Sequence, residues 1–342
     1  KSMKPASSSS LSSSADGDRE PRKQLFRVLR TDDSLKNSSC TPQPRTAIII
    51  YASDDSYYKN GMLNFMFLYY KLGLQNLAYV VLKTFGTAQE FTSEWKRNNP
   101  ALQFVQHIQV PPFQSTDSGY YRFAKTKFLV FNQTQFDRIV FFDTDSLVTE
   151  HFVDLLSFQF YSDHVTVAAP QAYWENTGCI TSAMMIIRPS TEFFNALATG
   201  PGFADMDVIN QVSMHVIKNT HFFSERAQVL PYTAFCLSAN IDRNSKYHNN
   251  YYNIDFDEYH CKGAAVVHFS YGGKPWYNSE SADIASFSPS RNRFAELYSK
   301  VRKFITIDFA NLRGATPMKI ADFFTDFYRN HSSVYEYLIS NS

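Results

Sequence analysis

Two aspartates separated by one residue stand directly after an apolar run near the middle of the chain. The run is Arg138-Ile139-Val140-Phe141-Phe142, and Asp143-Thr144-Asp145 follows it. Side chains at i and i+2 of an extended segment share one face, so both aspartates can approach the same cation while Thr144 points away. Carboxylate oxygens suit a hard divalent ion, and we predict Mn2+ here, with Mg2+ as the alternative.

The spacing of these aspartates is weak evidence by itself, because the chain also contains Asp205-Met206-Asp207 and Asp255-Phe256-Asp257. Only Asp143-Thr144-Asp145 has a strand-like apolar run before it and Ser146-Leu147-Val148 after it. That context also resembles the first motif of haloacid-dehalogenase-type phosphatases, in which the first aspartate is a nucleophile. Those enzymes are expected to carry a further acidic pair after the motif, whereas Asp54-Asp55 precedes it. A phosphatase is therefore kept as a minor alternative.

A second cluster of polar and small residues runs from His268 to Trp276, after the strand-like run 264–267. The His268 imidazole can complete a carboxylate-bound manganese site. Gly272 and Gly273 let backbone amides approach a diphosphate, and the Lys274 ammonium can neutralise a leaving group. A lone histidine is more often part of the core, but the glycines and the lysine at this spacing favour a site.

These residues need elements that bring them together. The run 46–52 is β-branched and apolar and stops before Asp54-Asp55, as a buried parallel strand does. A helix from Gly61 to Gly73 and a strand over 78–82 give a β-α-β start. Further predicted elements are helices over 120–131, 205–216 and 291–304, and strands over 138–142, 165–169 and 183–187. The fold class is therefore α/β, with a mixed, mostly parallel sheet flanked by helices, and its strand ends should gather the acidic residues in one crevice.

Composition limits the partners and the domains. The 342 residues are 44% apolar and 16% aromatic with a net charge of +1, which supports one large globular domain and gives no basic surface for nucleic acid. No apolar stretch reaches the length of a membrane helix. We predict a serine-rich disordered stem or linker over 1–44, a catalytic domain over 45–285, and a C-terminal helical extension over 286–342 that packs on that domain.

Sequons and cysteines bear on the compartment. Glycosylation sequons begin at Asn37, Asn132 and Asn330, and they are compatible with a lumenal protein. The four cysteines lack the CxxC spacing of a metal cluster, so they form one or two disulfides or remain buried thiols. Because the chain begins with Lys1 and a serine-rich segment, we expect a type II membrane protein of the Golgi lumen whose anchor has been removed; a cytoplasmic protein is the alternative.

Together these motifs resemble glycosyltransferase family 8, the group that contains glycogenin, over residues 46–276. The resemblance implies a GT-A fold and retaining transfer of a sugar from a UDP-sugar with Mn2+. The uridine contacts that it implies are Ala52, Ser53, Asp55 and Tyr58. The implied metal ligands are Asp143, Asp145 and His268. The other implied donor-binding positions are Lys127, Thr144, Ser182, Asp205, Met206, Gly272, Gly273 and Lys274.

Three of these positions would take part in the chemistry, again as the resemblance implies. Lys274 would stabilise the departing UDP together with the metal, and Asp205 would hold sugar hydroxyls. Lys127 would lie beside the donor. The protein would then act mainly through charge placed against the leaving group, with no side chain needed as a base.

Some positions depart from the family pattern. The family has Gly where this chain has Tyr271, which shifts the backbone contact to the diphosphate. It has Asn-Ser-Gly where the chain has Thr181-Ser182-Ala183, and Gln where the chain has Met206. The last two departures fall where the sugar would be, so they imply a different donor sugar, a different acceptor or lost activity.

The serine-rich stem, the sequons and the Asp-Met-Asp variant are similar to features of fungal Golgi N-acetylglucosaminyltransferases. We therefore expect UDP-N-acetylglucosamine as the donor, with UDP-glucose second, and a glycan or glycoprotein as the acceptor. The alternatives are a glycogenin-like glucosyltransferase and, from another class, an inactive glycan-binding protein with a transferase fold.

Overall fold

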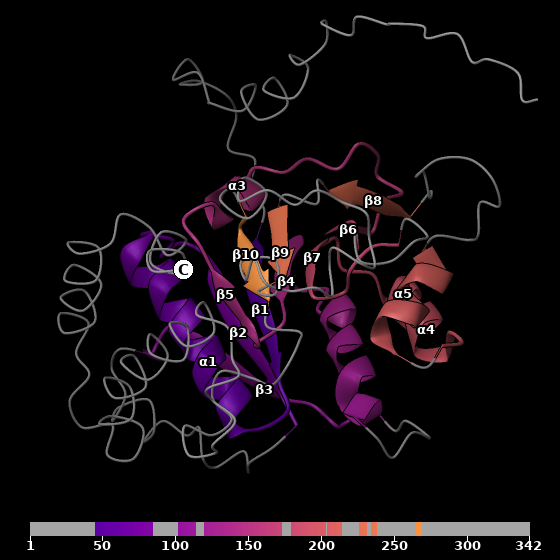
Figure 1. Ribbon diagram of the computed structural model, residues 1–342, viewed down its shortest axis with the longest axis horizontal. Helices are drawn as coiled ribbons and strands as arrows, with labels where there is room; N and C mark the ends of the chain where they lie inside the picture. Colours follow the sequence, from indigo (N-terminus) through magenta and orange to yellow (C-terminus); the bar gives the residue numbers. More distant parts are fainter. Residues whose placement is uncertain are drawn as a thin grey trace, which may run out of the picture. The chain divides into compact units, whose positions relative to one another are not determined.

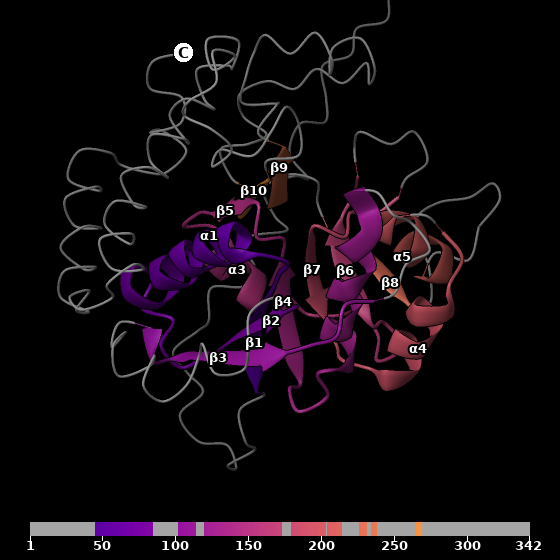
Figure 2. The same cartoon turned by 90° about the horizontal axis from the view of Figure 1, so that it is seen from below.

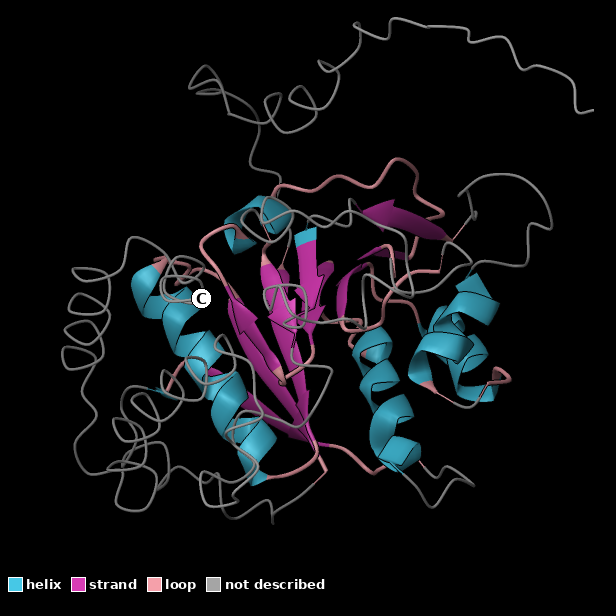
Figure 3. Cartoon of the chain, viewed as in Figure 1, coloured by secondary structure: helices cyan, strands magenta, loops and turns pink. Residues whose placement is uncertain are grey.

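A central sheet organises the described part of the chain (Figures 1 and 3). The computed structural model describes residues 45–84, 102–113, 120–172, 179–202, 204–213, 226–230, 234–237 and 264–268, all within Gln43–Ser342, the second of the two units into which the chain divides. The strands of the sheet are β1 (Thr46–Ala52), β2 (Ala78–Lys83), β3 (Val105–Gln109), β4 (Arg138–Phe142), β6 (Val167–Pro170), β7 (Met184–Ile187) and β8 (Ala227–Leu230).

The sheet is mixed and mostly parallel, as predicted. Its order is β3-β2-β1-β4-β7-β6-β8, in which β1 pairs in parallel with β2 and β4, β2 with β3, and β6 with β8. β7 runs antiparallel to both of its neighbours, β4 and β6. Every residue of β1 and β4 after the first is buried. Both faces of these strands are covered, which explains their continuous apolar sequences.

Helices cover both faces of the sheet (Figures 1 and 2). α1 (Asp55–Met66) continues into η2 (Phe67–Lys71) on one face, and η5 (Tyr120–Asn132), α4 (Thr191–Thr199) and α5 (Asp205–Ser213) contribute to the core on the other. Ile48 and Ile50 of β1 pack on the α1 side, whereas Ile49 packs on the η5 side, because alternate residues of a strand face opposite ways. Within the described ranges, none of the helices has the length and apolar character needed to cross a bilayer.

A small second sheet joins the two polar segments singled out in the sequence. It consists of β5 (Ser146–Val148), β10 (Val266–His268) and β9 (Phe235–Leu237), in the order β5-β10-β9. β5 follows Asp145 directly, and its first residue, Ser146, pairs with His268. α3 (Phe152–Leu156) comes next along the chain. The register of this sheet therefore places the imidazole beside the acidic motif.

The predicted start of the first helix was wrong. Gly61 was expected to begin it, but α1 begins at Asp55 because Asp54 caps it: the Asp54 carboxylate accepts a hydrogen bond from the Tyr57 amide at 3.2 Å. The first turn of α1 is polar, so an apolar stripe could not reveal it. The predicted strands over 165–169 and 183–187 begin at Val167 and Met184.

Several short elements were not predicted, namely β3, β5, α3, α4, β8 and β9. α4 had a start signal, since the Ser190 hydroxyl caps it by accepting the Phe193 amide at 3.1 Å. The predicted helix over 291–304, the extension over 286–342 and the whole of the predicted stem over 1–44 lie outside the described residues. The proposed domain boundaries therefore stay predictions.

Gly61 lets α1 lie close against the sheet and the acidic motif. A Cβ at this position would overlap the Ile50 side chain and would lie 3.2 Å from the Thr144 Cγ2 methyl. Any larger residue would push α1 away from β1 and from residue 144, because both neighbours are buried and packed. The close approach matters for the site, since residues of α1 contact the motif directly.

Candidate metal and donor site

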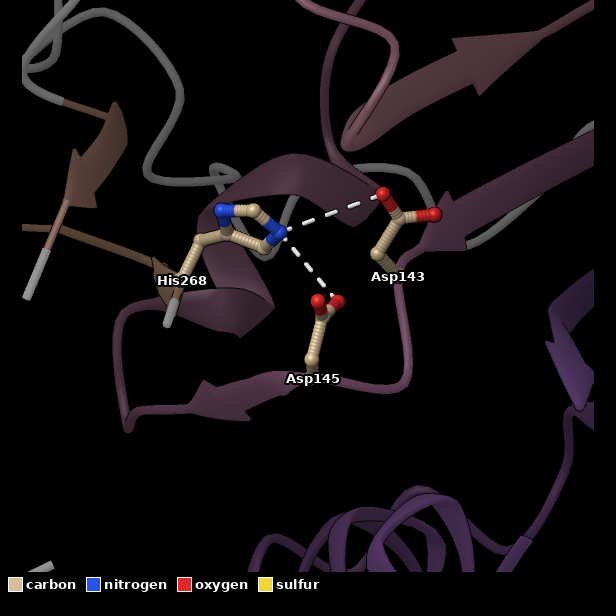
Figure 4. Close-up of side chains that lie close together, drawn as sticks. All are labelled: Asp143, Asp145 and His268. Atoms are coloured by element: carbon tan, nitrogen blue, oxygen red, sulfur yellow. Dashed lines mark ion pairs between the residues drawn. The ribbon is translucent and has the colours of Figure 1, made fainter. Parts of the chain in front are cut away.

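Three side chains that could bind a cation converge where β4, β5 and β10 meet. Asp143 follows the last residue of β4, Asp145 precedes β5, and His268 ends β10. Figure 4 shows the two carboxylates and the imidazole pointing toward one another. His268 Nε2 is 3.2 Å from Asp145 Oδ1 and 3.9 Å from Asp143 Oδ2. One potential ligand atom from each residue lies within 4.8 Å of the others.

This donor set fits a hard divalent ion. Ligand atoms on neighbouring corners of an octahedron with bonds of about 2.1 Å are about 3 Å apart, which is close to the His268–Asp145 distance of 3.2 Å. The other ring nitrogen, His268 Nδ1, is buried and has no hydrogen-bond partner among the described residues, so Nε2 is the atom directed at the acids. Two carboxylates with one imidazole form a set that can hold a divalent cation.

Lys127 joins the metal motif to a second acidic residue. From η5, its ammonium lies 2.7 Å from Asp143 Oδ1, 2.8 Å from Asp143 Oδ2 and 2.7 Å from Asp205 Oδ2. The Lys127 side chain is 8% exposed, and the two aspartate side chains are 19% and 13% exposed. One buried cation therefore holds acids from β4 and α5 together.

The charges in this network shift its pKa values in ways that can be traced. Burial alone would lower the pKa of Lys127, but attraction to Asp143 and Asp205 raises it above its usual range. Burial raises the pKa of Asp143; Lys127 opposes the rise and Asp145 adds to it. Burial would also raise the pKa of Asp205, but Lys127 and a hydrogen bond from Ser182 bring it below its usual value. The described site holds more acids than bases, and a divalent cation would relieve their repulsion.

The predicted sugar-binding residues lie on the Asp205 side of this network. Ser182 Oγ is 2.5 Å from Asp205 Oδ2, and the Ser182 residue is buried. Met206, the next residue along α5, is half-buried. Asn210 of α5 fixes the segment that carries Ser182. Its side-chain amide donates to the Ile180 carbonyl and accepts from the Ile180 amide, both at 2.8 Å. Ser182, Asp205 and Lys127 thus form one connected group beside the metal motif.

The predicted uridine loop comes at the carboxyl end of β1, next to the carboxyl end of β4. Ala52 ends β1 and is buried, Ser53 is half-buried, and Asp55 begins α1. Tyr58 lies in the core instead of the crevice: it is 1% exposed, and its hydroxyl is 2.9 Å from His107 Nε2 on β3. The expected contact of Tyr58 with the uridine therefore stays a prediction.

Other residues of the predicted site have different outcomes. The Thr144 side chain turns away from the acids, as predicted, and its hydroxyl donates to the Tyr51 carbonyl at 3.2 Å. Gly272, Gly273 and Lys274 lie outside the described residues, so their roles stay predictions. The sequence reasoning missed Asn60, which contacts the motif from α1, and its neighbour one turn later, Asn64. Two amides four residues apart inside an apolar helix could have been noticed.

The arrangement of the sheet and helices is similar to that of solved glycosyltransferases. A mixed, mostly parallel sheet flanked by helices is the GT-A arrangement. GlyE of Streptococcus pneumoniae TIGR4 superposes with a TM-score of 0.51 at 13% identity, over 82% of this chain and 64% of GlyE. An active-site mutant of LgtC superposes with a TM-score of 0.50 at 14% identity, over 74% of this chain and 95% of LgtC. The chain has the GT-A glycosyltransferase fold that we predicted.

Fungal proteins named Glucose N-acetyltransferase 1 are similar in sequence. The chain is 30% identical to that of Gibberella zeae over 177 residues, which is 47% of this chain and 36% of the relative. It is 29% identical to that of Aspergillus fumigatus over 178 residues, which is 48% of this chain and 44% of the relative. The match thus spans less than half the length of these relatives. No family model matches the chain, so membership of family 8 stays a prediction.

Proposed function

We propose that this chain is a retaining, Mn2+-dependent glycosyltransferase that uses UDP-N-acetylglucosamine to extend a glycan. The observation that carries the proposal is the convergence of Asp143, Asp145 and His268 beside the Lys127–Asp205 pair in a GT-A fold. Hard ligands next to a second acid with a defined orientation suit a site that holds a metal-bound diphosphate on one side and a sugar on the other.

In this proposal each described residue has a separate task. Asp143, Asp145 and His268 would hold Mn2+, which when bound supplies Lewis-acid stabilisation of the diphosphate. Asp205, oriented by Ser182 Oγ at 2.5 Å and by Lys127 at 2.7 Å, would accept hydrogen bonds from sugar hydroxyls. The Lys127 ammonium contacts both Asp143 and Asp205, so it fixes the distance between the metal ligand and the sugar-binding acid. The acceptor oxygen would bond to the anomeric carbon from the face that UDP leaves as the sugar–phosphate bond breaks, and the β-phosphate oxygen of the departing UDP would accept the hydroxyl proton. The protein would then act mainly through electrostatics.

The name of the fungal relatives mentions glucose and an N-acetyl transfer and no nucleotide sugar, so the donor needs a direct test. The experiment is a donor panel: UDP-N-acetylglucosamine, UDP-glucose and UDP-galactose, each incubated with the protein, Mn2+ and mannose-terminated oligosaccharides. We expect the first donor to give the highest kcat/KM. Acetyl-CoA with glucose belongs in the same panel, because an acetyl transfer would also fit that name. Release of CoA without turnover of any nucleotide sugar would contradict the proposal.

Met206 provides a specific test of the donor sugar. It stands next to Asp205 at a position where an amide would donate and accept hydrogen bonds, and its thioether instead offers a soft apolar surface. The methyl of an N-acetyl group could pack there. We predict that Met206→Gln narrows or reverses the preference for UDP-N-acetylglucosamine over UDP-glucose by about 1 to 3 kcal/mol. The ratio of the two kcat/KM values in both proteins measures this, and an unchanged ratio would leave Met206 as packing only.

The compartment is part of the same proposal: a type II protein of the Golgi lumen. Cys236 is disulfide-bonded, which favours an oxidising compartment. The sequon residue Asn132 is exposed at the end of η5, where an oligosaccharide can attach. We expect intact mass of the protein from its own cells to show N-linked glycan on Asn132, with loss of that mass in Asn132→Gln. An unglycosylated protein recovered from cytosol with its thiols reduced would favour the glycogenin-like alternative.

A further inference from the structure

Two buried asparagines of α1 contact the backbone of the metal motif. Asn60 and Asn64 are both 0% exposed, and their spacing of four residues puts them on one face of the helix. Their helical neighbours Met62, Leu63 and Phe65 belong to the apolar core. A buried amide costs free energy unless its polar atoms find partners, so two amides on one face of a core helix call for a specific reason.

Their partners are backbone groups on either side of Asp145. Asn60 Nδ2 donates to the Thr144 carbonyl and to the Ser146 carbonyl, the latter at 3.2 Å. Asn64 Nδ2 donates to the same Ser146 carbonyl at 2.8 Å, and Asn64 Oδ1 accepts from the Val148 amide at 3.0 Å. Carbonyls only accept and backbone amides only donate, so these partners fix the orientation of both side chains.

Asn64 takes the place of a neighbouring strand. β5 is the outer strand of its sheet, and Thr149, just after it, donates to the Ala265 carbonyl on the β10 side. Backbone groups alternate in direction along a strand, so the Ser146 carbonyl and the Val148 amide point away from β10. Asn64 satisfies both of them. β5 is therefore fixed on one edge by β10 and on the other by the Asn64 side chain, with Asn60 as a second donor to the Ser146 carbonyl.

We propose that Asn60 and Asn64 are positioning residues that set the spacing of the three metal ligands. Asp145 lies between the two carbonyls that Asn60 holds, and Ser146 is paired with His268 through β5 and β10. A shift of β5 would therefore move a carboxylate and the imidazole together, while Asp143 stays with β4. The proposal rests on the proposed function, because it concerns the site that would hold Mn2+.

The test measures Mn2+ binding to the folded protein without any donor. The electron paramagnetic resonance signal of the unbound Mn2+ left in solution gives the affinity. The first variant is Asn64→Leu, which removes both hydrogen bonds from Asn64 to β5 and keeps a side chain of similar size. The second is Asn60→Ser, a milder change that guards against loss of folding. Val80→Ala on β2 is the control: Val80 is fully buried in the core on the other face of the sheet, so its replacement lowers stability without touching the motif. We expect Mn2+ affinity about 10- to 100-fold weaker in both asparagine variants and within twofold of wild type in the control.

Three results would contradict the inference, and they are distinguishable. Wild-type affinity in either folded asparagine variant would show that α1 supports the fold without setting the ligand geometry. An equal loss in Val80→Ala would show that general destabilisation explains the effect. A wild-type protein that binds no Mn2+ would remove the metal site of the proposed function and this inference with it.

Discussion

Asp145→Asn is expected to abolish sugar transfer while leaving the fold intact. Asn keeps the shape of the side chain but loses the charge that would hold Mn2+. We expect kcat/KM to fall at least about 100-fold, which corresponds to a rise of about 3 kcal/mol or more in the activation free energy. In the metal-free protein the change should not destabilise the fold, because Asp145 repels Asp143 and raises its pKa. Loss of activity with unchanged or higher thermal stability is a combination that damage to the fold would not produce.

The measurement is UDP formation together with thermal unfolding, with and without Mn2+. Wild type should be stabilised by Mn2+, because a ligand that binds only the folded state raises its unfolding temperature. The variant should lose most of that stabilisation. Asp154→Asn is the control, since Asp154 is half-exposed on α3 and outside the site. Turnover that survives Asp145→Asn and thorough chelation would remove the manganese mechanism.

Lys127→Met should cost about 3 to 5 kcal/mol of folding free energy at neutral pH, because it leaves two buried carboxylates without their cation. Methionine roughly fills the volume of the lysine stem, so the loss would report charge more than packing. Removing one of the acids as well should restore part of the stability: Lys127→Met with Asp205→Asn is expected to be more stable than Lys127→Met alone. Urea unfolding of the three proteins measures this.

The pH dependence of this loss has a defined sign. In wild type the lowered pKa of Asp205 means that its pairing adds stability above the usual carboxyl pKa, and this is lost as pH falls through the lowered value. Without Lys127, burial raises the pKa values of Asp143 and Asp205, so the variant is most stable when both are protonated. The difference in free energy of unfolding between wild type and Lys127→Met should therefore narrow as pH falls from 7 toward 4.

Lys125→Met is the matched control for that experiment. Lys125 lies on the same segment, and its ammonium donates to the Gly202 carbonyl at 2.7 Å; among the described residues it pairs with no acid. Its loss should cost about 1 kcal/mol with little dependence on pH. If Lys125→Met and Lys127→Met lost equal stability at every pH, the charge network around Lys127 would have no special role.

The parts of the fold that the sequence predicts well are those where a local pattern suffices. β4 was predicted at its observed bounds, because a short continuous apolar run that ends in acids is typical of a buried strand. The metal ligands followed from hard-ligand chemistry combined with that position. The polar start of α1 and short strands such as β9 carry no comparable local signal, since tertiary pairing decides them.

The supporting residues around the site were harder to foresee. Lys127 was expected near the donor, but its simultaneous contact with Asp143 and Asp205 depends on η5 and α5 packing on the same face. Asn64 contacts Val148 across 84 positions of sequence, which no spacing rule anticipates. A family resemblance predicts that Tyr58 contacts the uridine, and packing places its ring in the core; the contact stays a prediction.

The measurement that tests the account most directly is UDP formation by the wild-type protein from UDP-N-acetylglucosamine and mannose-terminated oligosaccharides, before and after Mn2+ is removed by chelation. The account predicts turnover with Mn2+, loss of turnover on chelation, and recovery when Mn2+ is added back, through the site built by Asp143, Asp145 and His268. Absence of turnover with Mn2+ for every UDP-sugar, or turnover that chelation leaves unchanged, would contradict it.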